Sequence, residues 1–418
     1  MPRVSGADDV PAVLGGAPIC PADSWPRWPQ WDDTERAALL AALDDGGWWT
    51  GDGGRAQAFA DDFARFQDAS MGLAFTNGTH TLEAALAACG VGEGDEVIVP
   101  GLTFVATATA VLAVNAEPVL VDIDRWSLCI DPDAIEAAIT DRTRAVVAVH
   151  VAGAACDLDR VVALCADRGL ALVEDCAHAH GTRWRGKGVG SFGAFGSFSM
   201  QRSKLMTAGE GGVLIGSDAT LMARAWSYWN CGRVQGGAGY HHAGYGSNLR
   251  MTEWQGAVLR AQLARFPEQH RRRNAAAVAL GSQLATIPGL TPQARDPRMD
   301  AQGNYCFVFH YDAAQFAGLS LRGFEAALAA EGVPLDSPYP ALNTLEIFRT
   351  NNFAPRLRHL TRDYSRLSLP ESERAAKSTV WVEHRVLLAE LDKVLDLAHA
   401  CERIHRNAAA IAALETRR

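Results

Sequence analysis

One lysine, Lys204, lies between a polar turn and a glycine-rich stretch in the segment SFSMQRSKLMTAGEGGVLIG. A lysine that forms a Schiff base must lie at the edge of a pocket with backbone packed closely around it. Gly209, Gly211 and Gly212 permit that close approach. Most lysines are solvated surface charges, so Lys204 becomes a catalytic candidate only through the residues that accompany it.

Asp175 is the first of these companions, because it directly follows the apolar run ALVE. Pyridoxal 5'-phosphate (PLP) catalysis needs a carboxylate near the pyridine nitrogen. The protonated ring is the electron sink that stabilises the carbanion formed when a substrate loses its alpha proton. A strand-end aspartate together with Lys204 therefore predicts PLP chemistry.

A phosphate group would need a third feature, which the segment FTNGTHTLEAALAACG provides. Asn77, Gly78 and Thr79 turn the chain directly before an alanine-rich helical pattern, and the backbone N–H groups at a helix N-terminus favour a phosphate dianion. The same residues also make an ordinary helix cap. Their occurrence together with Asp175 and Lys204 favours the phosphate role.

The elements that position these residues follow from hydrophobic patterning between residues 70 and 215. Continuous apolar runs alternate with alanine-rich helical stretches, which predicts a parallel sheet covered on both faces. Right-handed crossovers place the strand ends at one edge, where ligands bind, so Asp175 belongs at the ligand edge. The predicted strands are EVIVP, EPVLVDI, AVVAVHV, ALVEDC and GGVLIG.

The flanking segments predict three regions. Residues 1–30 are rich in Pro, Gly and Trp and form an irregular arm. Residues 31–270 make a large PLP-binding domain, which begins with a helix from Asp32 that Gly46 and Gly47 end. Residues 271–418 make a small α+β domain. A long helical pattern at about 255–285 bridges the two domains, and the strand YCFVFHYD, a helix near 321–331 and a final helix from about 389 follow it.

Composition excludes several classes of protein. The 418 residues are 48% hydrophobic, with a formal net charge of -9, so no basic surface for nucleic acid or an anionic membrane is expected. The nine cysteines are odd in number and contain no C-x-x-C pair, which argues against a disulfide framework and against a metal site. With no signal peptide and no membrane-spanning run, we expect a cytoplasmic protein.

Four blocks in fixed order make the sequence resemble the DegT/StrS-type sugar and cyclitol aminotransferases, which are fold-type I PLP enzymes. The resemblance runs from about Trp25 to about Leu388. It implies an α/β fold, with a mainly parallel sheet in the large domain and a smaller α+β C-terminal domain. The blocks are PGLTFVATATAVLAVNAEPVLVDID, EDCAHAHG, SKLMTAGEGG and GSNLRMTEWQGAVLRAQL.

The resemblance also implies roles for individual residues. Lys204 matches the Schiff-base lysine, Asp175 the partner of the pyridine nitrogen, and His178 the polar residue beside the cofactor's 3-hydroxyl. Phe104 matches the aromatic side chain stacked on the ring. The phosphate site would take Gly78, Thr79, His80, Ser199 and, from the neighbouring subunit of a homodimer, Asn248.

Other interpretations of these weaker sites stay open. Phe104 also fits a plain core position, Asn248 a turn and His178 a buried structural histidine. The loop reads NGTH where many members have a serine-threonine-alanine type, so position 80 lacks a side-chain hydroxyl and His80 would contribute only its N–H.

The resembled family implies transfer of an amino group from glutamine or glutamate to a small ketone. The nearest branch acts on keto-inositols or 2-deoxy-scyllo-inosose in aminocyclitol antibiotic synthesis. A second branch, resembling 3-amino-5-hydroxybenzoate synthase, dehydrates and aromatises an aminated ring. A PLP-fold binding protein without turnover, or another PLP reaction, is a further alternative. Candidate substrate contacts, each equally consistent with a structural role, are Trp48, Trp49, His241, His242, Tyr339 and His384.

Overall fold

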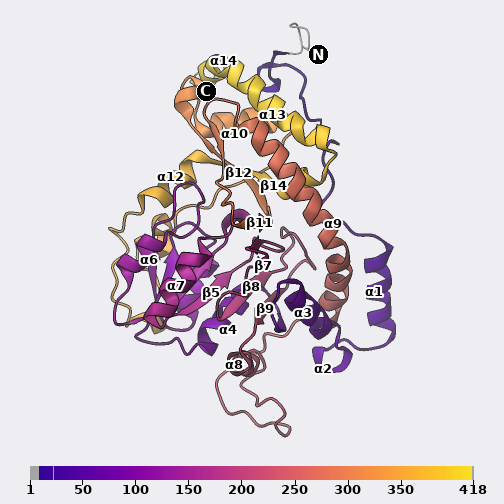
Figure 1. Ribbon diagram of the computed structural model, residues 1–418, viewed down its shortest axis with the longest axis vertical. Coiled ribbons are helices and arrows are strands. Elements are labelled where there is room, and N and C mark those ends of the chain that lie inside the picture. The colour runs from indigo at the N-terminus through magenta and orange to yellow at the C-terminus, as the bar shows by residue number, and fades with distance from the viewer. Residues whose placement is uncertain (1–8, 22, 417–418) are drawn as a thin grey trace.

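The computed structural model describes residues 9–21 and 23–416, and its centre is a seven-stranded sheet (Figure 1). The strand order is β1-β9-β8-β5-β4-β2-β3. Five neighbouring strands, from β8 to β3, are parallel, whereas β9 is antiparallel to both β8 and β1. The strands are β1 (Met71–Phe75), β2 (Glu96–Pro100), β3 (Glu117–Val121), β4 (Thr143–Val149), β5 (Ala171–Asp175), β8 (Phe195–Ser199) and β9 (Gly212–Gly216).

Helices cover both faces of this sheet, as the continuous apolar strands predicted. Phe59 and Phe63 of α3 pack on one face with apolar residues of α6 and α7. Leu82 of α4 and Val111 of α5 pack on the other face, together with α8. The helices are α3 (Arg55–Phe66), α4 (Gly78–Ala88), α5 (Ala106–Ala113), α6 (Pro132–Ala138), α7 (Leu158–Arg168) and α8 (Ala219–Trp229).

One strand direction was predicted wrongly. The run GGVLIG forms β9 but is antiparallel to β8, so its carboxyl end lies at the edge opposite Asp175. The chain returns directly through the Lys204 loop, and an antiparallel neighbour needs no crossover helix. Strands β1 and β8 were not predicted, because their residues MGLAF and FGSFS contain glycine and serine rather than β-branched residues.

A second, four-stranded antiparallel sheet, in the order β10-β12-β14-β13, forms the core of the C-terminal part. Its apolar face packs against α10 (Leu321–Ala330) and α13 (Leu391–Arg406), and α14 (Ala408–Glu415) follows. The strands are β10 (Leu290–Pro292), β12 (Cys306–Tyr311), β13 (Leu335–Asp336) and β14 (Thr379–Glu383). A third, small sheet lies between the seven-stranded and the four-stranded sheet. It consists of β6 (Arg183–Trp184), β7 (Lys187–Gly188) and β11 (Met299–Ala301).

The long helix α9 (Glu253–Leu284) connects the two cores. It runs from beside α1 (Asp33–Asp44) and α3 up to α13 (Figure 1). The boundary expected at residue 270 falls inside this helix, and Leu342, Phe348 and Tyr364 pack back on the large sheet's core. The division into domains therefore stays a prediction.

The N-terminal helix and arm are built as local signals suggest. Asp32 and Glu35 form a capping box at the start of α1. In the arm, Cys20 and Trp25 are buried in the core of the C-terminal part; residues 1–8 and 22 of the expected arm lie outside the described residues. Among the described helices, none is both long and apolar enough to cross a membrane.

Candidate active site

A cavity of about 560 Å³ lies at the carboxyl ends of β4 and β5, between the large sheet and the C-terminal part. Its lining comes from segments far apart in the chain, which is what the topology of a parallel sheet predicts for a ligand site. Of the site residues predicted from the sequence, those on its wall are Gly78, Thr79, Phe104, Asp175, His178, Ser199 and Lys204.

Lys204 is buried, and its backbone N–H donates to the carbonyl of Gln201 in a tight turn after β8. Its Nζ lies 4.3 Å from the centre of the Tyr305 ring. Burial lowers the pKa of the lysine to about 8, although the Asp175 carboxylate opposes this shift. About half of the amine is therefore in the neutral, nucleophilic form near pH 8, a much larger share than an ordinary lysine has at that pH.

Asp175 is the last residue of β5 and is also buried. Its Oδ2 accepts a hydrogen bond of 2.9 Å from the Thr107 hydroxyl, and its Oδ1 accepts one of 3.1 Å from the Ala177 N–H. Burial raises the pKa of the carboxyl, and the two hydrogen bonds oppose this rise. Such a buried carboxylate fits a cationic ring nitrogen, because a charged partner compensates for the lost hydration.

The phosphate end of the cavity is the first turn of α4. Asn77 caps the helix by accepting from the His80 N–H at 2.9 Å, and the His80 ring bonds the Thr76 hydroxyl at 2.7 Å. His80 is thus absent from the cavity wall, and its N–H, the one contribution expected of it, is already bonded. Gly78 and Thr79 keep the first-turn N–H groups that have no carbonyl partner within a helix, and these groups fit a phosphate.

Gly78 is required here for steric reasons. A Cβ at this position would lie 2.8 Å from the Cβ of Ser199, so the helix start and β8 can approach only if this residue has no side chain. Gly212 is packed equally closely against the backbone of Asn77, and Gly209 instead has a positive φ of 85°. Of Gly209, Gly211 and Gly212, which were expected to permit close approach, Gly212 lies against backbone, Gly211 against the side chains of Met200 and Met251, and Gly209 has no neighbour within 4 Å of an added Cβ.

His178 is buried and stacks on Tyr305, with ring centroids 4.1 Å apart and planes at 12°. Its Nδ1 accepts from the Ala152 N–H, which leaves the proton on Nε2, 3.1 Å from the Tyr339 hydroxyl. Burial, reinforced by the charge of Lys204, holds the pKa of His178 well below its usual value. The neutral ring is therefore a hydrogen-bonding group rather than a charge.

Of the two remaining predicted cofactor-binding residues, Phe104 lies on the cavity wall and Asn248 does not. Phe104 is 54% exposed at the cavity mouth, 6.0 Å from the Tyr339 ring, rather than in the core. Asn248 is exposed and pairs with Asn230 through the backbone, outside the cavity wall of its own chain.

Among the candidate substrate contacts, Tyr339 lies on the cavity wall. Trp48 and Trp49 are half exposed and contact Trp254 and Arg250 instead. His384 is buried and bonds the carbonyl of Ser203, so it does not line the cavity. His241 and His242 are exposed in a loop away from the wall.

Several lining residues were missed from the sequence. Thr107 lies one helical turn after Phe104, so the helical spacing of TFVATATA contains a signal for it. Asp336 and Trp381 come from the C-terminal sheet, and Tyr305 directly precedes its strand β12. Nothing in their local sequence indicates that this sheet closes the cavity.

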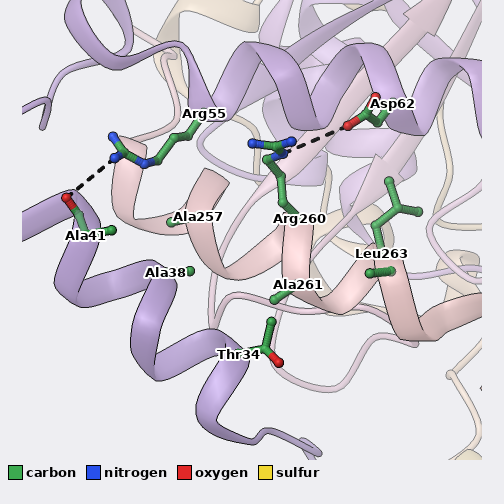
Figure 2. Close-up of a pocket in the computed structure, with 10 residues that line it drawn as sticks. Thr34, Ala38, Ala41, Arg55, Asp62, Ala257, Arg260, Ala261 and Leu263 are labelled. Atoms are coloured by element: carbon green, nitrogen blue, oxygen red, sulfur yellow. Dashed lines mark hydrogen bonds and ion pairs between the residues drawn. The ribbon is translucent and has the colours of Figure 1, made fainter.

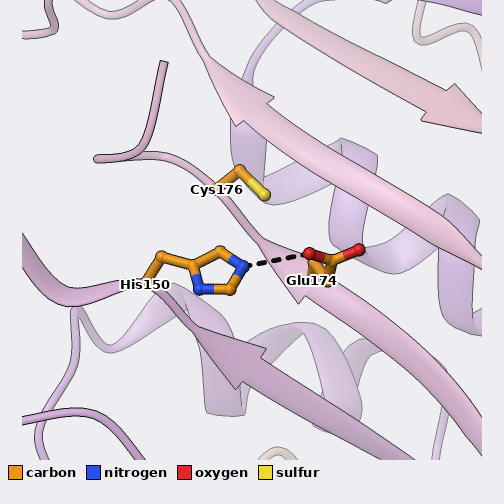
Figure 3. Close-up of side chains that lie close together, drawn as sticks. All are labelled: His150, Glu174 and Cys176. Carbon is orange, nitrogen blue, oxygen red and sulfur yellow. Dashed lines mark hydrogen bonds and ion pairs between the residues drawn. The ribbon is translucent and has the colours of Figure 1, made fainter. Parts of the chain in front are cut away.

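A buried cluster of His150, Glu174 and Cys176 has the composition of a metal site (Figure 3). The ligand atoms of His150 and Glu174, however, are already hydrogen-bonded. Glu174 accepts from the N–H groups of Gly190, Phe192 and Gly193 and from His150 Nε2, while His150 Nδ1 accepts from the Cys156 N–H. The cluster ties the 190–193 loop to the strand end that carries Asp175.

Lys204 and Asp175 are buried at the ligand edge of a mainly parallel sheet, and the N–H groups at the start of α4 line the same cavity. This combination defines a fold-type I PLP-dependent enzyme. The chain belongs to the DegT/DnrJ/EryC1/StrS aminotransferase family, whose sequence profile matches residues 30–397. It is therefore an aminotransferase-family enzyme, and PLP is the cofactor of this family.

Individual relatives cover almost the whole chain. The chain is 41% identical to the L-glutamine:scyllo-inosose aminotransferase of Streptomyces griseus, over 96% of this chain and 98% of that one. It is 39% identical to the 3-amino-5-hydroxybenzoate synthase of Amycolatopsis mediterranei (strain S699), over 88% and 94%. A crystal structure of 3-amino-5-hydroxybenzoic acid synthase superposes with a TM-score of 0.84 at 36% identity, covering 93% of this chain and 99% of that chain.

Proposed function

We propose that this enzyme transfers the amino group of L-glutamine or glutamate to the carbonyl of a keto-cyclitol or keto-sugar, in the biosynthesis of an aminocyclitol-type natural product. The observation that carries the proposal is the 41% identity to a scyllo-inosose aminotransferase over nearly the full length of both chains. The buried pair of Lys204 and Asp175 supports turnover rather than a scaffold that only binds.

The side chains divide the work. The bound cofactor supplies an aldehyde for the amine and a cationic ring that withdraws electrons from the substrate. Lys204 would hold the cofactor through its Nζ, and its free amine would act as the general base for the alpha proton. Asp175 would hold a proton on the ring nitrogen. Gly78, Thr79 and Ser199 would bind the phosphate.

Two further residues would orient the ring: Phe104 would cover it from the cavity mouth, and His178 would bond its hydroxyl. Both assignments follow the family resemblance, and both are supported by the position of these side chains on the cavity wall.

The rest of the cavity suits a polyhydroxylated substrate. Gln201, Glu210, Asp336 and Ser337 add hydrogen-bonding groups to its wall, and carboxylates accept well from hydroxyl donors. Among the described lining residues, Lys204 is the one cationic side chain. A neutral polyol ketone therefore fits better than a phosphorylated one.

The test is to incubate the PLP-loaded enzyme with L-glutamine or L-glutamate and a panel of keto-cyclitols, keto-sugars and aminodehydroshikimate, and to identify products by mass. We expect conversion of the cofactor to its pyridoxamine form with the donor alone, and an amine product from a keto-cyclitol or keto-sugar. An unchanged cofactor, with no product from any ketone, would refute the proposal.

Dehydration and aromatisation of an aminated ring is the second candidate, because the relative and the solved structure of that type are 39% and 36% identical. An aromatic product from aminodehydroshikimate, with the keto-cyclitols unchanged, would select it. The same assay thus separates the two reactions.

We also propose a homodimer that shares its active sites, with Asn248 of the partner subunit reaching the phosphate. A groove of about 540 Å³, which Ala38 and Ala41 of α1 help to line, lies between α1, α3 and α9 (Figure 2). Leu39, Leu40 and Leu43 of α1 do not line this groove and are exposed, and this exposure supports the dimer. Exposed apolar surface of this kind marks interaction sites. A cytoplasmic location is proposed too, supported by the nine free cysteines.

A further inference from the structure

Two consecutive backbone carbonyls directly before Lys204 are held by side chains from remote parts of the chain. The indole Nε1 of Trp28, in the N-terminal arm, donates to the carbonyl of Arg202 at 3.1 Å. The imidazole Nε2 of His384, which follows β14 in the C-terminal part, donates to the carbonyl of Ser203 at 3.1 Å. The arm and the C-terminal part thus meet at the loop that carries the lysine.

The two donors support each other. The rings of Trp28 and His384 meet edge to face, with centroids 4.5 Å apart and planes at 88°. The Arg273 guanidinium of α9 lies 5.2 Å from the centre of the Trp28 ring. Arg273 is fully buried, and its guanidinium has no hydrogen-bond partner among the described residues, so the indole face is its main electrostatic contact.

The held loop also contacts the residues around the lysine amine. The Ser203 hydroxyl is 2.9 Å from the Tyr305 hydroxyl, and the Tyr305 ring lies 4.3 Å from Lys204 Nζ. The Ser203 N–H donates to the Gln201 side chain and the Lys204 N–H to the Gln201 carbonyl, each at 2.8 Å. A shift of the Ser203 peptide would therefore move both the lysine and the ring beneath it.

We propose that Trp28 and His384 are positioning residues that fix the Lys204 peptide, and with it the amine, relative to the cofactor site. The inference rests on the proposed role of Lys204. An amine that must alternate between holding the cofactor and moving a proton needs its path fixed within tenths of an ångström. A misplacement of about 1 Å costs on the order of 100-fold in rate.

The test compares Trp28→Phe and His384→Phe, which keep an aromatic ring and lose the N–H donor, with His384→Gln, whose amide N–H can replace Nε2–H. Hydrogen–deuterium exchange of the peptide spanning residues 200–206 is measured first, in the cofactor-free protein. We expect exchange to be at least tenfold faster in both Phe variants and near wild type in His384→Gln. In the loaded enzyme, kcat should fall about 10- to 100-fold, with KM for the ketone within threefold.

Matched controls are available in the same chain. Trp25 donates from the same arm to the Gly332 carbonyl at 2.7 Å, and His310 donates to the Trp126 carbonyl at 3.3 Å, both away from the cavity. Trp25→Phe and His310→Phe should leave loop exchange and kcat unchanged. The proposal is overturned if the controls show the same losses, or if loop exchange in Trp28→Phe stays within twofold of wild type.

The test gives a clear outcome even if one variant fails to fold or no ketone is identified. Trp28 is only half-buried, so Trp28→Phe should fold even if His384→Phe does not, and that variant alone can decide. The exchange measurement needs neither cofactor nor ketone. A failure to find an amination product would therefore refute the proposed reaction and leave the positioning result standing on its own.

Discussion

The Nζ of Lys204 lies over the Tyr305 ring, and the same ring stacks against the His178 ring. The negative face of an aromatic ring favours the charged amine, whereas burial favours the neutral one. Burial dominates, since the pKa of the lysine falls to about 8. The Asp175 carboxylate opposes this fall, and the contribution of the Tyr305 ring can be measured separately.

In the cofactor-free protein, acylation of Lys204 should therefore be half-maximal near pH 8 rather than near 10.5. Below that pH the ammonium is unreactive, and above it the free amine reacts. Tyr305→Leu removes the ring that favours the ammonium and should lower the midpoint by about 0.5 to 1. Peptide mass spectrometry of the labelled lysine gives the titration, and a midpoint near 10.5 in the wild type would contradict the burial argument.

Thr107→Val should lower kcat about 10- to 100-fold, because it removes the hydroxyl that donates to Asp175 Oδ2 and so favours the protonated carboxyl. Cofactor affinity, measured by fluorescence titration, should fall with it. Thr109 lies in the same helix and its hydroxyl bonds only the Ala106 carbonyl, so Thr109→Val is the control. Equal losses in both variants would argue against a role for Thr107 through Asp175.

Gly78→Ala should weaken PLP binding at least tenfold, because the new Cβ would lie 2.8 Å from Ser199 and displace the N–H groups at the start of α4. Equilibrium dialysis with PLP measures the change. Gly92→Ala, where an added Cβ meets nothing within 4 Å, should bind PLP like the wild type. Normal affinity in Gly78→Ala would place the phosphate elsewhere.

Glu174→Gln should lower the free energy of unfolding by about 2–4 kcal/mol, because one carboxylate oxygen that accepts N–H groups becomes a donor facing them. Urea unfolding measures this loss. Glu268→Gln, an exposed position paired with Arg271, should change stability by less than about 0.5 kcal/mol. If calorimetry showed instead that the wild-type protein binds zinc tightly, a metal role for the cluster in Figure 3 would be favoured.

Leu40→Asp together with Leu43→Asp should convert a dimer into monomers, since charges on the exposed face of α1 oppose its burial. Analytical ultracentrifugation reads the result. Val278→Asp, equally exposed on α9, is the control and should leave the assembly unchanged. A wild-type protein that sediments as a monomer would refute the shared active site.

The sequence was informative wherever a local pattern determines the structure. Asp175 follows a continuous apolar strand, and Asn77 precedes an alanine-rich helix, so their positions at the ligand edge were predicted from short segments. The resemblance added His178 and Phe104, which local patterns alone would have left as ordinary core residues.

The sequence was uninformative where a residue acts through a distant contact. His384 was a candidate substrate contact because of its predicted loop position, yet it bonds a carbonyl 181 positions earlier in the chain. Tyr305 directly precedes strand β12 of the second sheet, and only the packing of that sheet against the first brings its ring to Lys204. Strand β8 was missed because its pairing, rather than its FGSFS composition, makes it a strand.

Helix α9 has a mechanical consequence. Its 32 residues extend about 48 Å, with one end beside α1 and α3 and the other beside α13. A helix that packs into both cores resists rotation of one core against the other. We therefore expect the ketone to enter and the product to leave through the mouth of the cavity. The rate of product release should then depend on side chains at the mouth, such as Phe104, rather than on closure of one core against the other.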